Sequence, residues 1–224
     1  MRQIKRKVSI DSIKPAEVKV ATSDGGNERE FFVFHVYGKP GANYLVEVDE
    51  DAVYLNTVYI GSVSDLLSET KEDFERAVAE TINNLRQGGV SIGRDGLVKL
   101  IELMRNGDYE TFTEDLIDID KALGLLNELN KTTRLSERVT IAAKYLADAA
   151  IDHFGNIKNF TTPEGVDLGI HCWDGKRYRP CEGDVGKWLE DVYRALRLEY
   201  YGIRYTVLRR KVMTMLKDKT RDKT

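Results

Sequence analysis

The 224-residue sequence contains few of the residue types on which metal sites and nucleophilic centres depend. It has two cysteines and three histidines. Cys172 and Cys181 do not complete a zinc site even with His171, because a structural zinc ion needs four ligands. No histidine stands out as part of a set with serine and aspartate, or with cysteine, that would indicate a nucleophilic centre. We therefore expect no metal, no cofactor and no catalytic residue.

Long apolar segments are also lacking. No run approaches the roughly 20 apolar residues that a membrane helix needs. The basic start at residues 1–7 is not followed by an apolar core, which argues against a signal peptide. Both absences favour a cytoplasmic protein. In that compartment Cys172 and Cys181 are expected as reduced thiols, although their spacing of nine residues leaves a disulfide open.

Charge is distributed unevenly along the chain. Residues 171–224 hold 14 basic and 8 acidic side chains, whereas the first 170 residues hold 20 basic and 29 acidic ones. A basic carboxyl-terminal region on an acidic body is expected of a protein that contacts phosphate or an acidic partner. A solvated charged surface is the alternative interpretation.

The first sixty residues have the pattern of short strands with glycine-rich turns, which predicts an antiparallel sheet or a small barrel. The predicted strands span residues 17–21, 30–37, 44–48 and 53–60. Seven aromatic side chains in this region could form a base-stacking platform, as in oligonucleotide-binding barrels, or could be the core of the sheet. They are Phe31, Phe32, Phe34, Tyr37, Tyr44, Tyr54 and Tyr59.

From Ser64 the apolar period becomes helical. The first helix is expected to have Ser68 or Thr70 as a cap and to stop at Gly88-Gly89. Further helices are predicted at about 94–105, 113–129 and 135–154. The segment 155–165 contains breakers and is predicted to be a linker.

A hairpin is predicted around Asp174-Gly175, a favoured pair for a two-residue turn. This register pairs Trp173 with Lys176 and His171 with Tyr178, on one face that could stack a base and neutralise a phosphate. Alternatively, Trp173 and Tyr178 pack onto the following helix at Trp188 and Leu189.

Two amphipathic helices follow, separated by a break at Gly202. The first has Asp184 as its expected cap and an apolar stripe: Val185, Trp188, Leu189, Val192 and Leu196. The second has the stripe Tyr205, Leu208, Val212 and Met215. Its polar side carries Arg204, Arg209, Arg210 and Lys211. The arrangement is similar to a helix-turn-helix, whose second helix meets DNA.

The strings W-D-G-K-R-Y-R-P-C-E-G-D-V (173–185) and R-R-K-V-M-T-M-L-K-D-K-T (209–220) resemble the segment before the helicase motor in primase–helicases of phages, plasmids and large DNA viruses. The resemblance covers the last quarter to third of the chain. It implies a role in DNA replication, with single-stranded DNA or a primer–template as partner. A helicase or primase subunit, or further copies of this chain, are the protein partners it implies.

Two motifs are rejected. The segment 88–95 has the glycine spacing of a phosphate-binding loop but lacks its lysine and its serine or threonine, so no ATPase of this type is expected. Residues 116–120 look like the paired aspartates of archaeal-type primases. However, no Ser-x-His follows, and on a helix Asp118 and Asp120 point about 200° apart.

Together these patterns predict an α+β protein with a β-rich domain (1–62), a helical domain (63–155) and a hairpin-plus-helices module (163–224). We expect a non-catalytic DNA-binding or assembly module of a mobile-element, viral or archaeal replication protein. The alternatives are a divergent primase using Asp118 and Asp120, and a protein–protein adaptor without nucleic-acid binding. The expected nucleic-acid contacts are Trp173, Lys176, Arg177, Tyr178, Arg179, Arg204, Arg209, Arg210 and Lys211.

Overall fold

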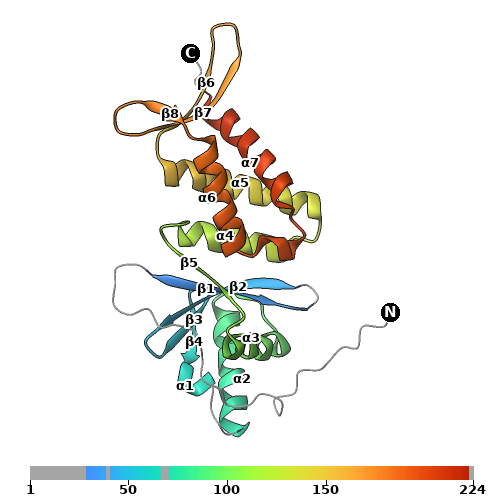
Figure 1. Cartoon of the computed structure of the whole chain (residues 1–224). Coiled ribbons are helices and arrows are strands. Elements are labelled where there is room, and N and C mark those ends of the chain that lie inside the picture. The colour runs from blue at the N-terminus through green and yellow to red at the C-terminus, as the bar shows by residue number, and fades with distance from the viewer. Residues whose placement is uncertain (1–28, 39–40, 67–70, 222–224) are drawn as a thin grey trace. The chain divides into compact units, whose positions relative to one another are not determined.

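The computed structural model describes residues 29–38, 41–66 and 71–221 (Figure 1). The strand expected at 17–21 and the caps expected at Ser68 and Thr70 lie outside these ranges. The chain divides into two compact units, Met1–Thr113 and Glu114–Thr224. Each unit combines helices with an antiparallel sheet, so the expected α+β class is confirmed.

The sheet of the first unit has the strand order β4-β3-β2-β1-β5, and all neighbours are antiparallel. Its strands are β1 (Glu30–Val36), β2 (Ala42–Asp49), β3 (Ala52–Leu55), β4 (Val58–Ser62) and β5 (Glu110–Thr113). Of the two architectures expected here, the described strands form the open sheet, since β4 and β5 are its edges.

The single strand expected at 53–60 is two strands joined by a tight turn. Asn56 and Thr57 adopt positive φ angles of 48° and 68°, as the turn of a two-residue hairpin requires. The Asn56 side chain stabilises this turn, because its Oδ1 accepts a hydrogen bond from the Leu45 amide at 3.0 Å. The polar pair Asn56-Thr57 between two apolar runs was the sequence signal for this turn.

One face of this sheet is covered by α2 (Lys71–Gln87) and α3 (Arg94–Asn106), with the short helix α1 (Val63–Leu66) beside them (Figure 1). The expected helix at 94–105 is confirmed, and it ends at Gly107, whose φ of 67° is the left-handed conformation that favours glycine at a helix end. Phe34, Val78 and Leu97 belong to the buried core between these layers.

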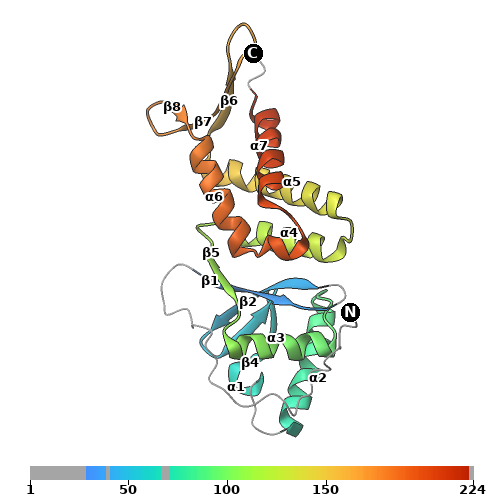
Figure 2. The ribbon, with the colours of Figure 1, turned by 45° about the vertical axis from the view of Figure 1, so that its right-hand side comes forward.

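The second unit contains a three-stranded sheet of order β6-β7-β8 and four α-helices (Figure 2). Its elements are α4 (Ile119–Lys131), α5 (Leu135–Phe154), β6 (Ile157–Thr161), β7 (Asp167–Trp173), β8 (Tyr178–Pro180), α6 (Glu182–Ala195), the 3-10 helix η2 (Leu198–Tyr201) and α7 (Tyr205–Thr220).

Two predicted element boundaries in this unit are wrong. The linker at 155–165 contains the strand β6, which pairs with β7 throughout its length. Its buried Ile157 and Asn159 alternate with less buried neighbours, a period of two over only five residues. The helix expected at 113–129 begins instead at Ile119, because Asp118 is its N-cap and accepts a hydrogen bond from the Lys121 amide at 3.1 Å.

The division into two units differs from the three domains expected from the sequence. The helices of the predicted middle domain are shared: α2 and α3 pack on the first sheet, whereas α4 and α5 belong to the second unit. The small residues Ala142, Ala143 and Ala147 of α5 are fully buried, and α5 packs closely against α7. Helices bury their apolar stripes against the nearest complementary surface, and residue period alone does not specify which surface that is.

None of the helices in the described ranges is both long and apolar enough to cross a lipid bilayer.

Candidate nucleic-acid interface

The hairpin between β7 and β8 has a four-residue loop, Asp174–Arg177, in place of the expected two-residue turn. Trp173 pairs with Tyr178 and His171 with Pro180. This register is shifted by two residues from the expected one, so Trp173, His171 and Tyr178 still share a face, whereas Lys176 lies in the loop. A shift of two residues preserves the face of each side chain, because the side-chain period of a strand is two.

The Asp174 carboxylate organises this loop. Its Oδ1 accepts hydrogen bonds from the backbone amides of Lys176 at 3.0 Å and Arg177 at 2.9 Å. These amides hold the pKa of Asp174 below its usual value. The loop therefore presents Lys176 and Arg177, both exposed, on a backbone fixed by an Asx-type turn.

Cys172 and Cys181 form a disulfide, which corrects the expectation of free thiols. Cys172 lies on the buried face of β7 and Cys181 is the N-cap residue of α6. Asp184, the expected cap, is inside the first turn of this helix. The backbone brings the two cysteines together, because the Cys181 amide donates to the Ile170 carbonyl oxygen at 3.1 Å.

The α6 stripe predicted from the sequence is confirmed as buried. One alternative predicted that Trp173 and Tyr178 pack onto Trp188, but Trp188 has other partners. Its ring stacks on His153 with centroids 5.4 Å apart, and its Nε1 donates to the Leu116 carbonyl oxygen at 2.7 Å. Trp173, by contrast, is 43% exposed.

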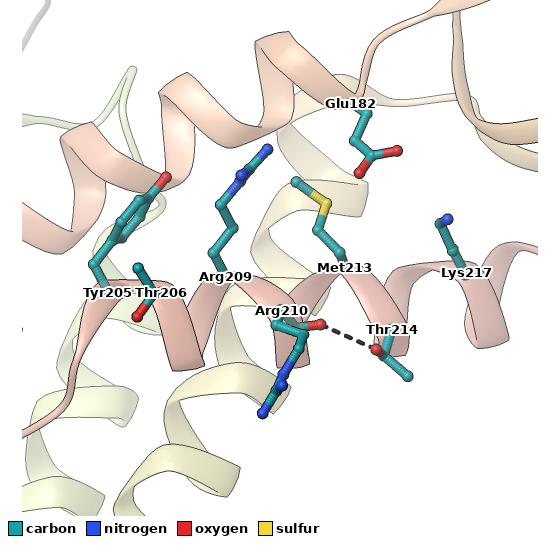
Figure 3. Close-up of a pocket in the computed structure, with 8 residues that line it drawn as sticks. All are labelled: Glu182, Tyr205, Thr206, Arg209, Arg210, Met213, Thr214 and Lys217. Atoms are coloured by element: carbon teal, nitrogen blue, oxygen red, sulfur yellow. Dashed lines mark hydrogen bonds between the residues drawn. The ribbon is translucent and has the colours of Figure 1, made fainter.

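A groove of about 410 Å³ lies along α7, at the amino-terminal end of α6 (Figure 3). It is lined by Glu182, Tyr205, Thr206, Arg209, Arg210, Met213, Thr214 and Lys217. Three of these side chains are cations and one is a carboxylate. Two threonines, the Tyr205 ring and Met213 complete a lining that combines positive charge, hydroxyl groups and a small apolar surface.

Arg209 lies close to α6, and the Gly186 position makes room for it. A Cβ atom added to Gly186 would be 3.2 Å from the Arg209 Nε. Tyr205 is fixed beside it, since its hydroxyl donates to the Gly186 carbonyl oxygen at 2.8 Å. Burial raises the pKa of Tyr205, and Arg209 opposes that rise. The phenol is therefore a neutral hydrogen-bond donor at neutral pH.

The groove cations differ in their partners. Lys217 pairs with Asp167 at 2.8 Å, which raises the pKa of Lys217 and lowers that of Asp167. Arg209 and Arg210 form no ion pair with any residue that the structure describes. Figure 3 shows Arg209 and Arg210 pointing to different sides of α7. Both guanidinium groups therefore lack an ion-pair partner among the described residues, and each faces its own side of α7 (Figure 3).

The remaining predicted contacts lie elsewhere in the second unit. Arg179 is opposite Cys172, on the α6 side of the sheet, and is 3.9 Å from Asp184. Arg204 is the N-cap residue of α7 and is exposed. Lys211 donates to the Thr140 hydroxyl of α5 at 2.7 Å and does not line the groove. The structure therefore places Arg209 and Arg210 in the lining of one groove, on different sides of α7 (Figure 3), and brings Trp173 and Tyr178 into contact elsewhere.

Several residues of these surfaces were missed from the sequence. Thr206, Met213, Thr214 and Lys217 line the groove. The spacing of Thr206, Arg210, Thr214 and Lys217 by three or four residues on one helix face could have indicated them. Phe160, in the segment expected to be a linker, lies beside Tyr178 and His171.

The two aspartates of the primase-like motif lie at the start of a helix. In the described part of the chain, no group of three or more His, Cys, Asp or Glu side chains is arranged to hold a metal ion. Asp118 caps α4 with its side chain, and Asp120 lies in the first turn of that helix, so the pair is not on a strand.

Comparison of the chain with protein-family models, with curated proteins and with solved structures finds no match.

Proposed function

We propose that the second unit is a non-catalytic nucleic-acid-binding module of a DNA replication protein. The observation that carries the proposal is the α6–α7 groove, in which Arg209 and Arg210 accompany Lys217. Arginine binds phosphate through a planar fork of N–H donors. The Thr206 hydroxyl adds a donor that suits a phosphate oxygen, whereas the Tyr205 and Thr214 hydroxyls donate to backbone carbonyl oxygens.

The hairpin loop provides a second group of basic side chains in the same unit. Lys176 and Arg177 are exposed and have no ion-pair partner among the described residues. Contacts of this kind give affinity with little sequence preference, because phosphates are common to all sequences. A role in replication is the part of the proposal that rests on the resemblance to the region before the helicase motor of primase–helicases.

The test is fluorescence anisotropy with labelled single-stranded and duplex DNA over a salt series. For the Arg209→Ala/Arg210→Ala variant we expect weaker binding and a shallower salt dependence. Each lost phosphate contact reduces the slope of log K against log salt by about 0.7 to 0.9. Removal of both arginines should therefore reduce the slope by about 1.4 to 1.8.

A matched control removes two cations from the first unit. Arg86→Ala/Arg94→Ala changes the net charge by the same amount, and both side chains are exposed. If the two double variants lose equal affinity, binding depends on net charge and not on the groove. If the unmodified protein binds neither DNA at low salt, the proposal is wrong and an adaptor that binds protein becomes the better explanation.

A further inference from the structure

The outward face of the β6-β7-β8 sheet carries a cluster of aromatic rings. Along β6 and β7, buried residues alternate with less buried ones, and the less buried set includes Lys158, Phe160, His171 and Trp173. Tyr178 joins them from β8, opposite Trp173. The other face, with Ile157, Ile170 and the disulfide, is buried.

The rings are in mutual contact across all three strands. Phe160 lies 5.2 Å from His171 and 5.3 Å from Tyr178, and Tyr178 lies 5.1 Å from Trp173, measured between ring centroids. All three pairs meet at interplanar angles of 60° to 79°. Edge-to-face packing fixes the ring positions and leaves parts of their faces uncovered.

Basic residues lie on this face and in the loop that follows it. Lys158 Nζ lies 5.6 Å from the centroid of the Tyr178 ring. Lys176 and Arg177 occupy the loop that follows Trp173. Asp174 is the one carboxylate in that loop, and its Oδ1 is already used by two loop amides. The local charge therefore favours a ligand that offers both flat apolar groups and negative charge.

From this juxtaposition we infer that the aromatic face stacks unpaired bases of a single-stranded nucleic acid. Stacking uses the π-face that every base has, and lysine and arginine beside the rings neutralise the phosphates. Duplex bases are stacked on one another and present only edges and backbone, so they have no free π-face that could stack on these rings. The inference rests on the proposed function and adds to it a second site, made of residues other than those of the groove, that selects unpaired strands.

The experiment compares three labelled ligands at equal length: a 20-nucleotide oligothymidine, an abasic oligonucleotide with the same phosphates, and a duplex. We expect oligothymidine to bind at least tenfold more tightly than the abasic strand, the scale of one or two stacked bases. Trp173→Leu should remove most of that difference, whereas Trp173→Phe should retain it. An oligouridine ligand shows whether the face also accepts RNA.

Tyr59→Ala is the matched control, because Tyr59 is an exposed aromatic residue of the first unit at 48% exposure. It should not change any of the affinities. Equal binding of the oligothymidine and abasic strands overturns the inference while leaving phosphate binding by the groove intact. Absence of binding to all ligands overturns the proposed function and this inference together. Base-dependent binding that Trp173→Leu leaves unchanged also overturns the inference, since the bases then stack elsewhere.

Discussion

The two units both contain antiparallel sheets rich in aromatic residues, but they use these residues differently. In the first unit Phe31 and Phe34 lie on opposite faces of β1, and both are fully buried. In the second unit the rings on one face of the β6-β7-β8 sheet remain partly exposed, with Trp173 the most exposed of them. An aromatic residue on a strand is therefore not evidence of a binding surface by itself. The covering of its sheet face decides which role it has.

The two units also differ in charge. The first holds 14 basic and 19 acidic residues, a net charge of −5, and the second holds 20 and 18, a net charge of +2. The difference in net charge is small, but in the second unit part of the positive charge is concentrated at Arg209 and Arg210. These two side chains have no ion-pair partner among the described residues. The four predictions that follow test this contrast, from the largest expected effect to the smallest.

Loss of an aromatic ring should have very different consequences in the two units. Phe34→Ala removes a fully buried ring and should lower the free energy of unfolding by about 3 to 5 kcal/mol. Trp173→Ala removes a partly exposed ring and should lower it by less than about 1 kcal/mol. Urea denaturation followed by circular dichroism measures both. Comparable losses would mean that the outward face is part of a core.

The disulfide should stabilise the second unit. It closes a short loop, because Cys172 and Cys181 are nine residues apart, and the chain-entropy model gives about 2 to 3 kcal/mol for a loop of this length. Denaturation with and without a reductant measures the effect. The Cys172→Ser/Cys181→Ser variant should match the reduced protein and should not respond to the reductant. Reaction of the native, unreduced protein with a thiol reagent would contradict the disulfide.

The Asp167–Lys217 pair should make stability depend on acid pH. The pKa of Asp167 is lowered in the folded protein, mainly by its hydrogen bond from Lys217. The stabilising contribution is therefore fully present above the usual aspartate pKa of 3.8 and is lost as the pH falls through the lowered folded value. Denaturation midpoints between pH 2 and 5 should show this loss, and Asp167→Asn should reduce it. An unchanged pH profile in that variant would show that the pair does not contribute.

Gly186→Ala should give the smallest effect, a loss of DNA affinity of a few-fold. The added Cβ meets the Arg209 side chain at 3.2 to 3.3 Å, so the guanidinium group must move while its charge is kept. Gly183→Ala is the control in the same helix, because a Cβ there meets nothing within 4 Å. Both substitutions should leave helix stability unchanged or slightly higher. Fluorescence anisotropy with duplex and single-stranded DNA measures the affinity of both variants. Equal affinities of the Gly186→Ala and Gly183→Ala proteins would show that the position of the Arg209 side chain does not matter for DNA binding.

Much of the second unit could be predicted from local pattern. The stripe of α6 and the break at Gly202 follow from apolar spacing and from a residue that accepts positive φ, here 76°. The sequence correctly predicts Trp173 and Tyr178 on one face of the sheet. The observed register differs from the predicted one by two residues, and an even shift keeps each side chain on its face. Phe160 was missed because a five-residue strand among threonines, proline and glycine has too few alternating positions to be distinguished from a loop.

By itself the sequence determined the α+β class, most helices and the positions of the basic residues, because these depend on residue type and on periods of two and 3.6. It did not determine how elements are shared between units, the Cys172–Cys181 bond or the groove residues on α7. Those depend on which surfaces meet when distant segments pack. Only the tertiary structure shows that Phe160 contacts Tyr178 and that the Arg209 side chain lies next to Gly186. Both contacts join elements that are separate in the chain.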